Sequence, residues 1–235
     1  LAGGDLYPVG VAPYWVSEFC GRAGGLMGTR HRHRGARRDK DVVFFALPHP
    51  GGWDARQDKH LAEVLAGKGQ LFVIGRKEDL APLRPGRRIA GFTGGAAPDA
   101  GLYAWGKRRP LAPLWYFDQF VRGWATTGEL IGACTRAGRM PVIWMSVWLE
   151  GALVRNALFL RHDNLMEPWH EGYLFHEDRY VPPLAPGYAG GAFLDAVEAI
   201  LRTLRGQLGR LGRAGRWLAA ACRAGRRPHV VAVGE

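Results

Sequence analysis

Short apolar runs alternate along this chain with longer segments of helical periodicity, and this alternation restricts the fold more than any other feature. Pro8 weakens the first run, because proline has no backbone N–H to donate to a sheet. Alternation of strands and helices is typical of a parallel sheet covered by helices. We therefore predict an α/β fold of the Rossmann type, with a three-layer parallel sheet and helices on both faces. The six runs are DLYPVGV (5–11), DVVFFAL (41–47), QLFVIG (70–75), RIAGFT (88–93), PVIWMSV (141–147) and HVVAVG (229–234).

Four segments have the apolar spacing of helices. They are residues 14–26, 54–67, 114–138 and roughly 191–224. Apolar residues such as Phe120, Trp124 and Ile131 give the third segment a broad apolar face, and Gly138 supplies its stop. The last segment contains glycines at 206, 209, 212 and 215, which weaken a helix, so we expect a break there.

The length of 235 residues and the apolar content of 47% suit one domain covering residues 1–235. Within it, residues 150–190 are predicted to form an irregular excursion over the ligand edge of the sheet. Residues 224–234 resemble residues 2–10, since each joins a glycine-marked turn to an apolar strand. The alternative prediction is therefore that residues 225–235 begin a second, truncated unit.

Cysteine usage and hydropathy predict a cytoplasmic protein without a membrane partner. The three cysteines form no C-x-x-C pair, so neither a disulfide framework nor a structural zinc site is indicated. We find no signal-peptide pattern near the first residues. The most apolar stretch, residues 141–160, contains Glu150 and Arg155, whose charges are costly in hydrocarbon.

The formal net charge of +11 favours anionic partners. A basic cluster, RHRHRGARRDK, covers residues 30–40. No zinc finger, RNA-recognition signature or convincing helix-turn-helix accompanies it, so we do not expect a nucleic-acid partner. Nucleic-acid binding through residues 30–40 and 205–227 remains a third hypothesis, and a solvated basic loop is the simpler interpretation of the cluster.

The candidate binding residues follow three of the predicted strands, because ligands of open parallel sheets sit beyond the carboxyl ends of the strands. Glycines there let backbone amides approach an anion, and arginine pairs with phosphate. Ordinary connections without a ligand are the alternative. No P-loop and no G-x-G-x-x-G is present, and we predict no cofactor. The candidates are Ser17, Arg22, His49, Gly51, Gly52, Thr93, Gly94 and Gly95.

The order of these parts resembles the sugar isomerase (SIS) fold, which binds phosphosugars. The likeness covers roughly residues 1–160: a strand, the S-E-x-x-x-R-A-G-G helix, a strand, a Pro/Gly loop, a helix and a strand. Members of that fold hold phosphate with Ser/Thr-rich loops, whereas the loop ALPHPGG contains neither residue type. The resemblance implies a phosphorylated sugar or another small anion as ligand, and a homodimer.

The segment HDNLMEPWHEGYLFHED, residues 162–178, is the candidate for acid/base chemistry. Its three histidines share no helical face and lack the H-E-x-x-H spacing, so we predict no metal site. An aldose-ketose isomerase needs one group to move a proton between carbons and another to shuttle hydroxyl protons. A structural or interface loop is the alternative. The candidate catalytic residues are His176, Glu177, His170 and Glu150, and Arg155 is a candidate phosphosugar ligand.

Two functions from different classes follow from these observations. The first is a phosphosugar-binding SIS-like protein that acts as a sugar-phosphate isomerase. The second is a non-catalytic α/β interaction module that forms a homodimer or a complex, with tryptophan and arginine side chains as anchors.

Overall fold

A computed structural model of the chain describes part of the sequence in detail. By contact clustering the chain divides into two compact units, Leu1–Gly190 and Gly191–Glu235. Helix α6 crosses this boundary, so the division alone does not decide between one domain and two. The described residues are 6–10, 42–46, 70–75, 89–92, 101–103, 106, 112–143, 145, 149–158, 175–176, 180–227 and 229.

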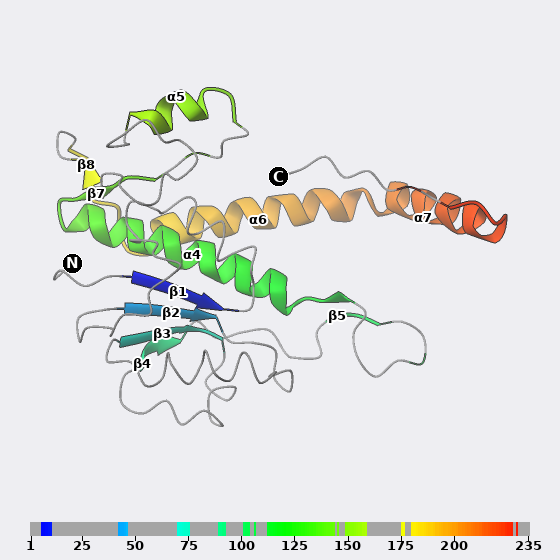
Figure 1. Cartoon of the computed structure of the whole chain (residues 1–235), viewed down its shortest axis with the longest axis horizontal. Helices are drawn as coiled ribbons and strands as arrows, with labels where there is room; N and C mark the ends of the chain where they lie inside the picture. The colour runs from blue at the N-terminus through cyan, green and yellow to red at the C-terminus, as the bar shows by residue number, and fades with distance from the viewer. Residues whose placement is uncertain are drawn as a thin grey trace. The chain divides into compact units, whose positions relative to one another are not determined.

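Four strands of the first unit form one parallel sheet (Figure 1). Their order in space, β1-β2-β3-β4, is their order in the sequence. Among these strands β1 lies at the edge, where a proline such as Pro8 is tolerated. The side chain of Ile74 at the end of β3 is fully buried. The strands are β1 (Leu6–Gly10), β2 (Val42–Ala46), β3 (Gln70–Ile74) and β4 (Ile89–Phe92).

These strands lie within four of the apolar runs that the sequence analysis assigned to strands. The expected helices at 14–26 and 54–67 lie outside the described residues, as does most of the run at 229–234. The three-layer arrangement therefore stays a prediction. A second, short sheet consists of two antiparallel strands of two residues each, β5 (Gly101–Leu102) and β6 (Ala112–Pro113).

Helix α4 (Trp115–Arg136) confirms the helix expected at 114–138. It contacts β3 and β7 of the same unit. Within residues 117–136, the buried positions are occupied by small and polar residues rather than by the large apolar ones. Phe117, for example, is 47% exposed. Gly138, with a φ of +71°, follows its last turn. Among residues 117–136, whose burial the structure describes, the buried ones are Gln119, Gly123, Thr127, Gly132, Cys134 and Thr135.

The run at 141–147 is not the fifth strand of the sheet that the sequence analysis expected. Only Met140–Pro141 (β7) is extended and paired, and it pairs antiparallel with Phe175–His176 (β8). The described residues 142, 143 and 145 belong to no regular element. Their apolar character is explained by burial instead, since Pro141 and Val142 are fully buried.

Of residues 150–190, only 150–158, 175–176 and 180–190 are described, so the predicted irregular excursion stays a prediction. These described residues contain the helix α5 (Ala152–Ala157), the strand β8 and the first residues of α6. Gly151, with a φ of +74°, precedes α5, and Ala152 is fully buried. Whether this segment covers the ligand edge stays a prediction.

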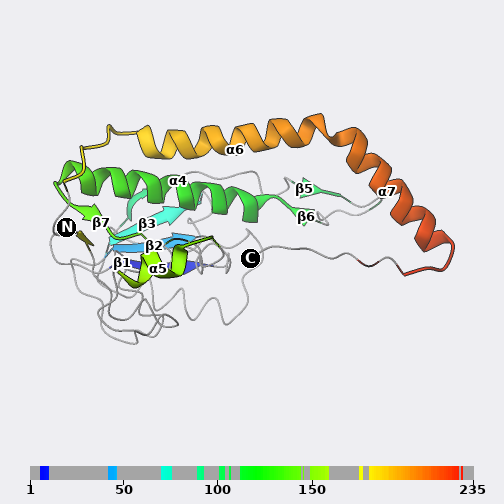
Figure 2. The same cartoon turned by 90° about the horizontal axis from the view of Figure 1, so that it is seen from above.

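The expected break in the last helix is confirmed. Helix α6 (Tyr188–Gly206) and helix α7 (Leu208–Arg223) are separated at Gln207, and the chain changes direction there (Figure 2). Glycine at 206 weakens the helix at this point. Gly225, with a φ of +71°, ends α7, and the N–H of Arg226 donates to the carbonyl of Ala221. Among the described residues no helix has the length and apolar character needed to cross a bilayer.

Candidate functional site: the carboxyl edge of the parallel sheet

The carboxyl ends of the parallel strands lie at one edge of the sheet. Gly10 is in register with Ala46, Ala46 with Ile74, and Phe92 ends β4 opposite Val73. Neighbouring strands are about 4.8 Å apart, so the chain leaves β2 and β4 at points about 10 Å apart. We call this edge, marked by residues 10, 46, 74 and 92, the carboxyl edge.

The candidate binding residues after these strands lie outside the described residues, but chain length limits how far they are from the carboxyl edge. Thr93 follows Phe92 directly, and His49 is three residues from Ala46. One residue spans at most about 3.6 Å, so the Cα of His49 lies within about 11 Å of that of Ala46. Ser17 and Arg22 are seven and twelve residues from Gly10, which leaves their positions far less restricted.

The strand order sets a limit on where a crevice lies. Ligand crevices of open α/β sheets occur where the strand order reverses. Among β1 to β4 the order does not reverse, so these four strands alone supply no such crevice. A ligand of this edge has to be held by the loops that follow the strands.

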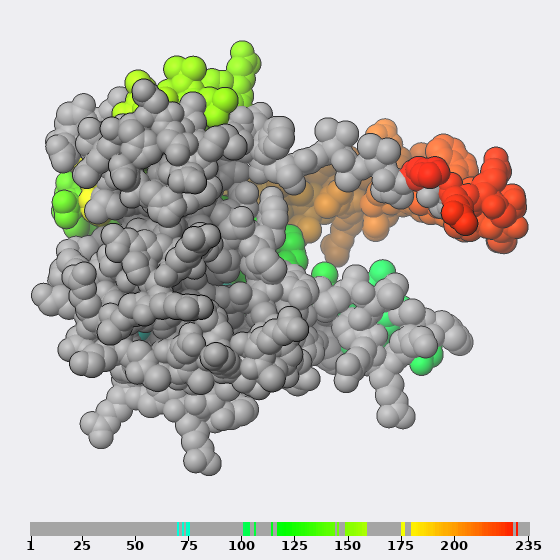
Figure 3. Space-filling model, viewed as in Figure 1, coloured from blue at the N-terminus to red at the C-terminus, as the bar shows by residue number. Residues whose placement is uncertain are grey.

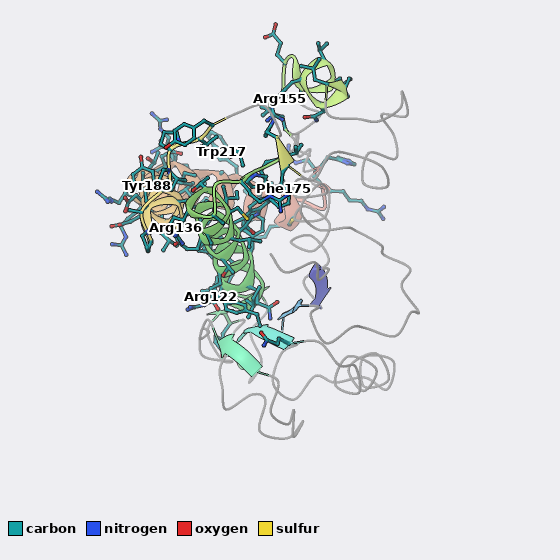
Figure 4. The ribbon with its side chains drawn as sticks, turned by 90° about the vertical axis from the view of Figure 1, so that its left-hand side faces the viewer. Arg122, Arg136, Arg155, Phe175, Tyr188 and Trp217 are labelled. Atoms are coloured by element: carbon teal, nitrogen blue, oxygen red, sulfur yellow. The ribbon has the colours of Figure 1, made fainter. Side chains whose placement is uncertain are left out.

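Three candidate residues are described, and they lie around the segment 140–158 rather than on the strands of the parallel sheet. Arg155 is on α5, and its Nη1 donates to the carbonyl oxygen of Ile143 at 2.6 Å and to Oδ1 of Asn156 at 3.2 Å. Figure 4 labels Arg155 on this helix. Glu150 lies in the exposed turn that precedes α5. Arg155 therefore has a structural role whether or not it also binds a ligand.

Asn156, beside Arg155, explains why the run at 141–147 does not continue as a strand. Its Oδ1 accepts from the backbone N–H of Met145 at 3.0 Å, and its Nδ2 donates to the carbonyl of Met145 at 2.9 Å. Both backbone groups of Met145 are thus paired with a side chain and not with a neighbouring strand. Asn156 is itself buried, with 4% of its surface exposed.

His176 is the one candidate catalytic histidine that the structure describes. It lies on β8 opposite Met140 and is half-buried. Its neighbour Phe175 lies under the guanidinium of Arg139, whose Cζ is 4.3 Å from the ring centroid. His170 and Glu177 lie outside the described residues. The structure thus pairs His176 with Met140, a few residues before Ile143 and Met145, whose backbone groups Arg155 and Asn156 bind.

Sequence analysis missed Glu129 of α4. Its Oε2 accepts from the N–H of Gly187 and its Oε1 from the N–H of Gly190, both at 2.8 Å. These N–H groups belong to the start of α6, where helix donors have no partner within the helix. They hold the pKa of the Glu129 carboxyl below its ordinary value of 4.5, Gly187 most strongly, and Arg136 lowers it further. Gly187 itself has no side chain to accept from these donors, so a side chain of another helix does so.

The cysteine in α4 is a buried thiol. Cys134 is 5% exposed, and burial raises the pKa of its thiol. A thiol of this kind is a poor nucleophile at neutral pH. Cys20 lies outside the described residues. In the part of the chain that the structure describes, no three His, Cys, Asp or Glu side chains gather as a metal site.

Comparison with known proteins adds no assignment to this geometry. No family model, no curated protein and no solved structure matches the chain. The resemblance to the SIS fold therefore depends on the order of the elements and on the residues quoted for it.

Proposed function

We propose that this protein binds phosphorylated sugars at the carboxyl edge of β1–β4, as a SIS-like protein. The observation that carries the proposal is the parallel register of the four strands. Because all four run in one direction, the loops with His49, Gly51 and Gly52, and with Thr93, Gly94 and Gly95, begin at the same edge. Antiparallel neighbours would have sent these loops to opposite ends of the sheet.

The chemistry of the loops suits a phosphate. Backbone N–H groups at glycines approach an anion closely, and an arginine such as Arg22 pairs with phosphate oxygens in a bidentate manner. The net charge of +11 raises the local concentration of anions around the protein. Uncharged sugars gain from neither effect, so the proposed ligand is the phosphorylated form.

Isomerisation is the proposed reaction, with acid/base groups supplied by the segment that includes His176. Histidine titrates near neutral pH and is able both to accept and to return a proton. His170, Glu177 and Glu150 are the other candidates for the proton transfers. In this proposal the protein needs no cofactor, because an aldose-ketose interconversion moves protons without net oxidation.

Thermal denaturation in the presence of hexose and heptose phosphates tests the binding proposal. A ligand at 100 times its dissociation constant stabilises the folded state by about 2.7 kcal/mol. For a chain of this size that corresponds to a rise in Tm of roughly 5 to 10 °C. The unphosphorylated sugars and inorganic phosphate serve as ligand controls. No rise in Tm with any phosphosugar would contradict the proposal.

Two variants locate the binding, and a third serves as a matched control. Arg22→Ala and His49→Ala are expected to reduce the rise in Tm caused by the phosphosugar. Arg202→Ala removes the same charge from α6, where Arg202 pairs with Glu198 on the exposed surface, and is expected to leave the rise unchanged. Conversion of a bound aldose phosphate to its ketose then distinguishes an isomerase from a protein that only binds.

A further inference from the structure

Helix α7 separates its arginines from its leucines. At about 100° per residue, Arg210, Arg213, Arg216, Trp217 and Arg223 fall within an arc of about 140°. On the other side, Leu208, Leu211, Leu218 and Cys222 fall within an arc of about 80°. We call the first set the arginine face. Between its long side chains lie only the small residues Gly209 and Ala220.

The arginine face is open to solvent and carries no compensating negative charge. Residues 208–220 are exposed, and the side chains of α7 lie at the surface in the view of Figure 3. Trp217 is 73% exposed, the highest value among the large apolar residues of this helix. The sequence contains no Asp or Glu between Glu198 and Glu235. Arg226 and Arg227 continue the positive charge beyond the end of the helix.

We propose that the arginine face of α7 binds single-stranded nucleic acid, with Arg210, Arg213, Arg216 and Arg223 on the phosphates and Trp217 stacked on an unpaired base. Arg210 and Arg223 are about 20 Å apart along the helix axis, which gives the face room for several phosphates. Proteins that bind single strands combine such a positive surface with aromatic rings on which bases stack. Glycine and alanine between the arginines let the strand approach the helix closely.

The position of Trp217 favours nucleic acid over an anionic membrane surface. Helices that lie in a membrane interface place Trp, Phe and Leu on one face and the basic residues on the other. In α7 the tryptophan lies among the arginines, about 100° or more from Leu211 and Leu218. A bilayer that accepted the leucines would leave Trp217 in water, whereas a base stacked on it covers its ring.

The proposal is independent of the sugar-phosphate site, because its residues all lie in the second unit. It is tested by the fluorescence anisotropy of a labelled twelve-residue oligothymidine titrated with the full chain. Four phosphate contacts predict a slope of about −3 for the logarithm of affinity against the logarithm of salt concentration. A slope near zero, or the absence of binding at low salt, would overturn the proposal.

A pair of double variants assigns the binding to the arginine face. Arg210→Ala with Arg213→Ala should halve the slope to about −1.4. Arg202→Ala with Arg205→Ala removes the same charge from α6 and should leave the slope near −3. Equal losses in the two double variants would overturn the assignment. Alanine is a better helix former than arginine, and all four positions are exposed, so the variants keep their helices.

Variants of Trp217 distinguish the contribution of base stacking to the affinity from that of the arginine charges. Trp217→Ala should weaken binding about tenfold without changing the slope, and Trp217→Phe should retain most of the affinity. An unchanged affinity in Trp217→Ala would overturn the stacking role. A DNA duplex should compete less well than the single strand. Stronger competition by the duplex would overturn the proposal, as would binding to phosphatidylglycerol vesicles together with no binding to the oligonucleotide.

Discussion

The carboxylate of Glu129 lies 2.8 Å from the backbone nitrogen of Gly190, so that one helix supplies the N-terminal cap of another. Glu129 is in the middle of α4, and Gly190 is in the first turn of α6. The second carboxylate oxygen accepts from the N–H of Gly187. The side chain thereby satisfies two backbone donors that a local cap residue normally serves.

Replacing Glu129 is expected to destabilise the folded protein. Glu129→Ala removes both acceptors and should lower the free energy of unfolding by about 1 to 2 kcal/mol. Glu129→Gln keeps one acceptor and should cost about half as much. Urea denaturation followed by circular dichroism measures both. Glu198→Gln, which removes an exposed partner of Arg202, should cost less than about 0.5 kcal/mol. Equal costs for Glu129→Ala and Glu198→Gln would contradict the capping role.

The same cap should make stability depend on pH. The pKa of Glu129 is lower in the folded protein than its ordinary value of 4.5. Above about pH 4.5 the cap therefore makes its full contribution to the stability of the folded protein. This contribution is lost as the pH falls through the folded-state pKa of Glu129. The difference in Tm between the wild type and Glu129→Gln should be constant from pH 7 to about 5 and should shrink at lower pH. A difference that grows in acid would contradict this.

Alanine substitutions at two glycines, Gly128 and Gly191, are expected to change the stability of the protein in opposite directions. A Cβ at Gly128 would lie 3.1 Å from backbone atoms of Ala189 and Gly190, so Gly128→Ala should destabilise the protein. A Cβ at Gly191 meets nothing within 4 Å, so Gly191→Ala should stabilise α6 by up to about 1 kcal/mol. Thermal denaturation of the two variants compares them directly. A stabilising Gly128→Ala would show that α4 does not approach residues 189–190 this closely.

Asn156 is expected to be essential to the segment that replaces the predicted fifth strand. Asn156→Ala removes two hydrogen bonds to Met145 and leaves partly buried backbone groups without these partners, at a cost of about 2 to 3 kcal/mol. Val154→Ala, on the exposed side of α5, is the matched control and should cost less than about 0.5 kcal/mol. Comparable costs would mean that the amide does not hold Met145.

The two described cysteines should differ sharply in reactivity. Cys222 is exposed on α7, whereas Cys134 is buried and burial raises the pKa of its thiol. In a Cys20→Ser variant, a thiol reagent at pH 8 should react quickly with one cysteine and with the second only after denaturation. Adding Cys222→Ser should remove the fast reaction. Rapid reaction of Cys134 in the folded protein would contradict its burial.

Elements with strong local signals were predictable from the sequence. The apolar runs identified β1 to β4, the spacing at 114–138 identified α4, and Gly206 marked the break before α7. The separation of Trp217 and the arginines from the leucines of α7 is also present in the sequence, but it becomes a face only with the bounds of the helix.

The features that sequence analysis missed depend on contacts between distant residues. Glu129 and Gly190 are 61 residues apart, and no local pattern links them. The run at 141–147 has the composition of a strand, but Asn156 and Arg155 occupy backbone groups that a strand would use. The large apolar residues of α4 suggested a core face, whereas its buried positions include Gln119 and Thr127.

Hydrogen–deuterium exchange with and without a bound hexose phosphate tests the central proposal most directly. If the carboxyl edge of β1–β4 binds the phosphosugar, exchange should slow in peptides covering 47–53 and 93–97 and stay unchanged in α7. Protection confined to 208–223, or no protection anywhere at saturating ligand, would contradict it.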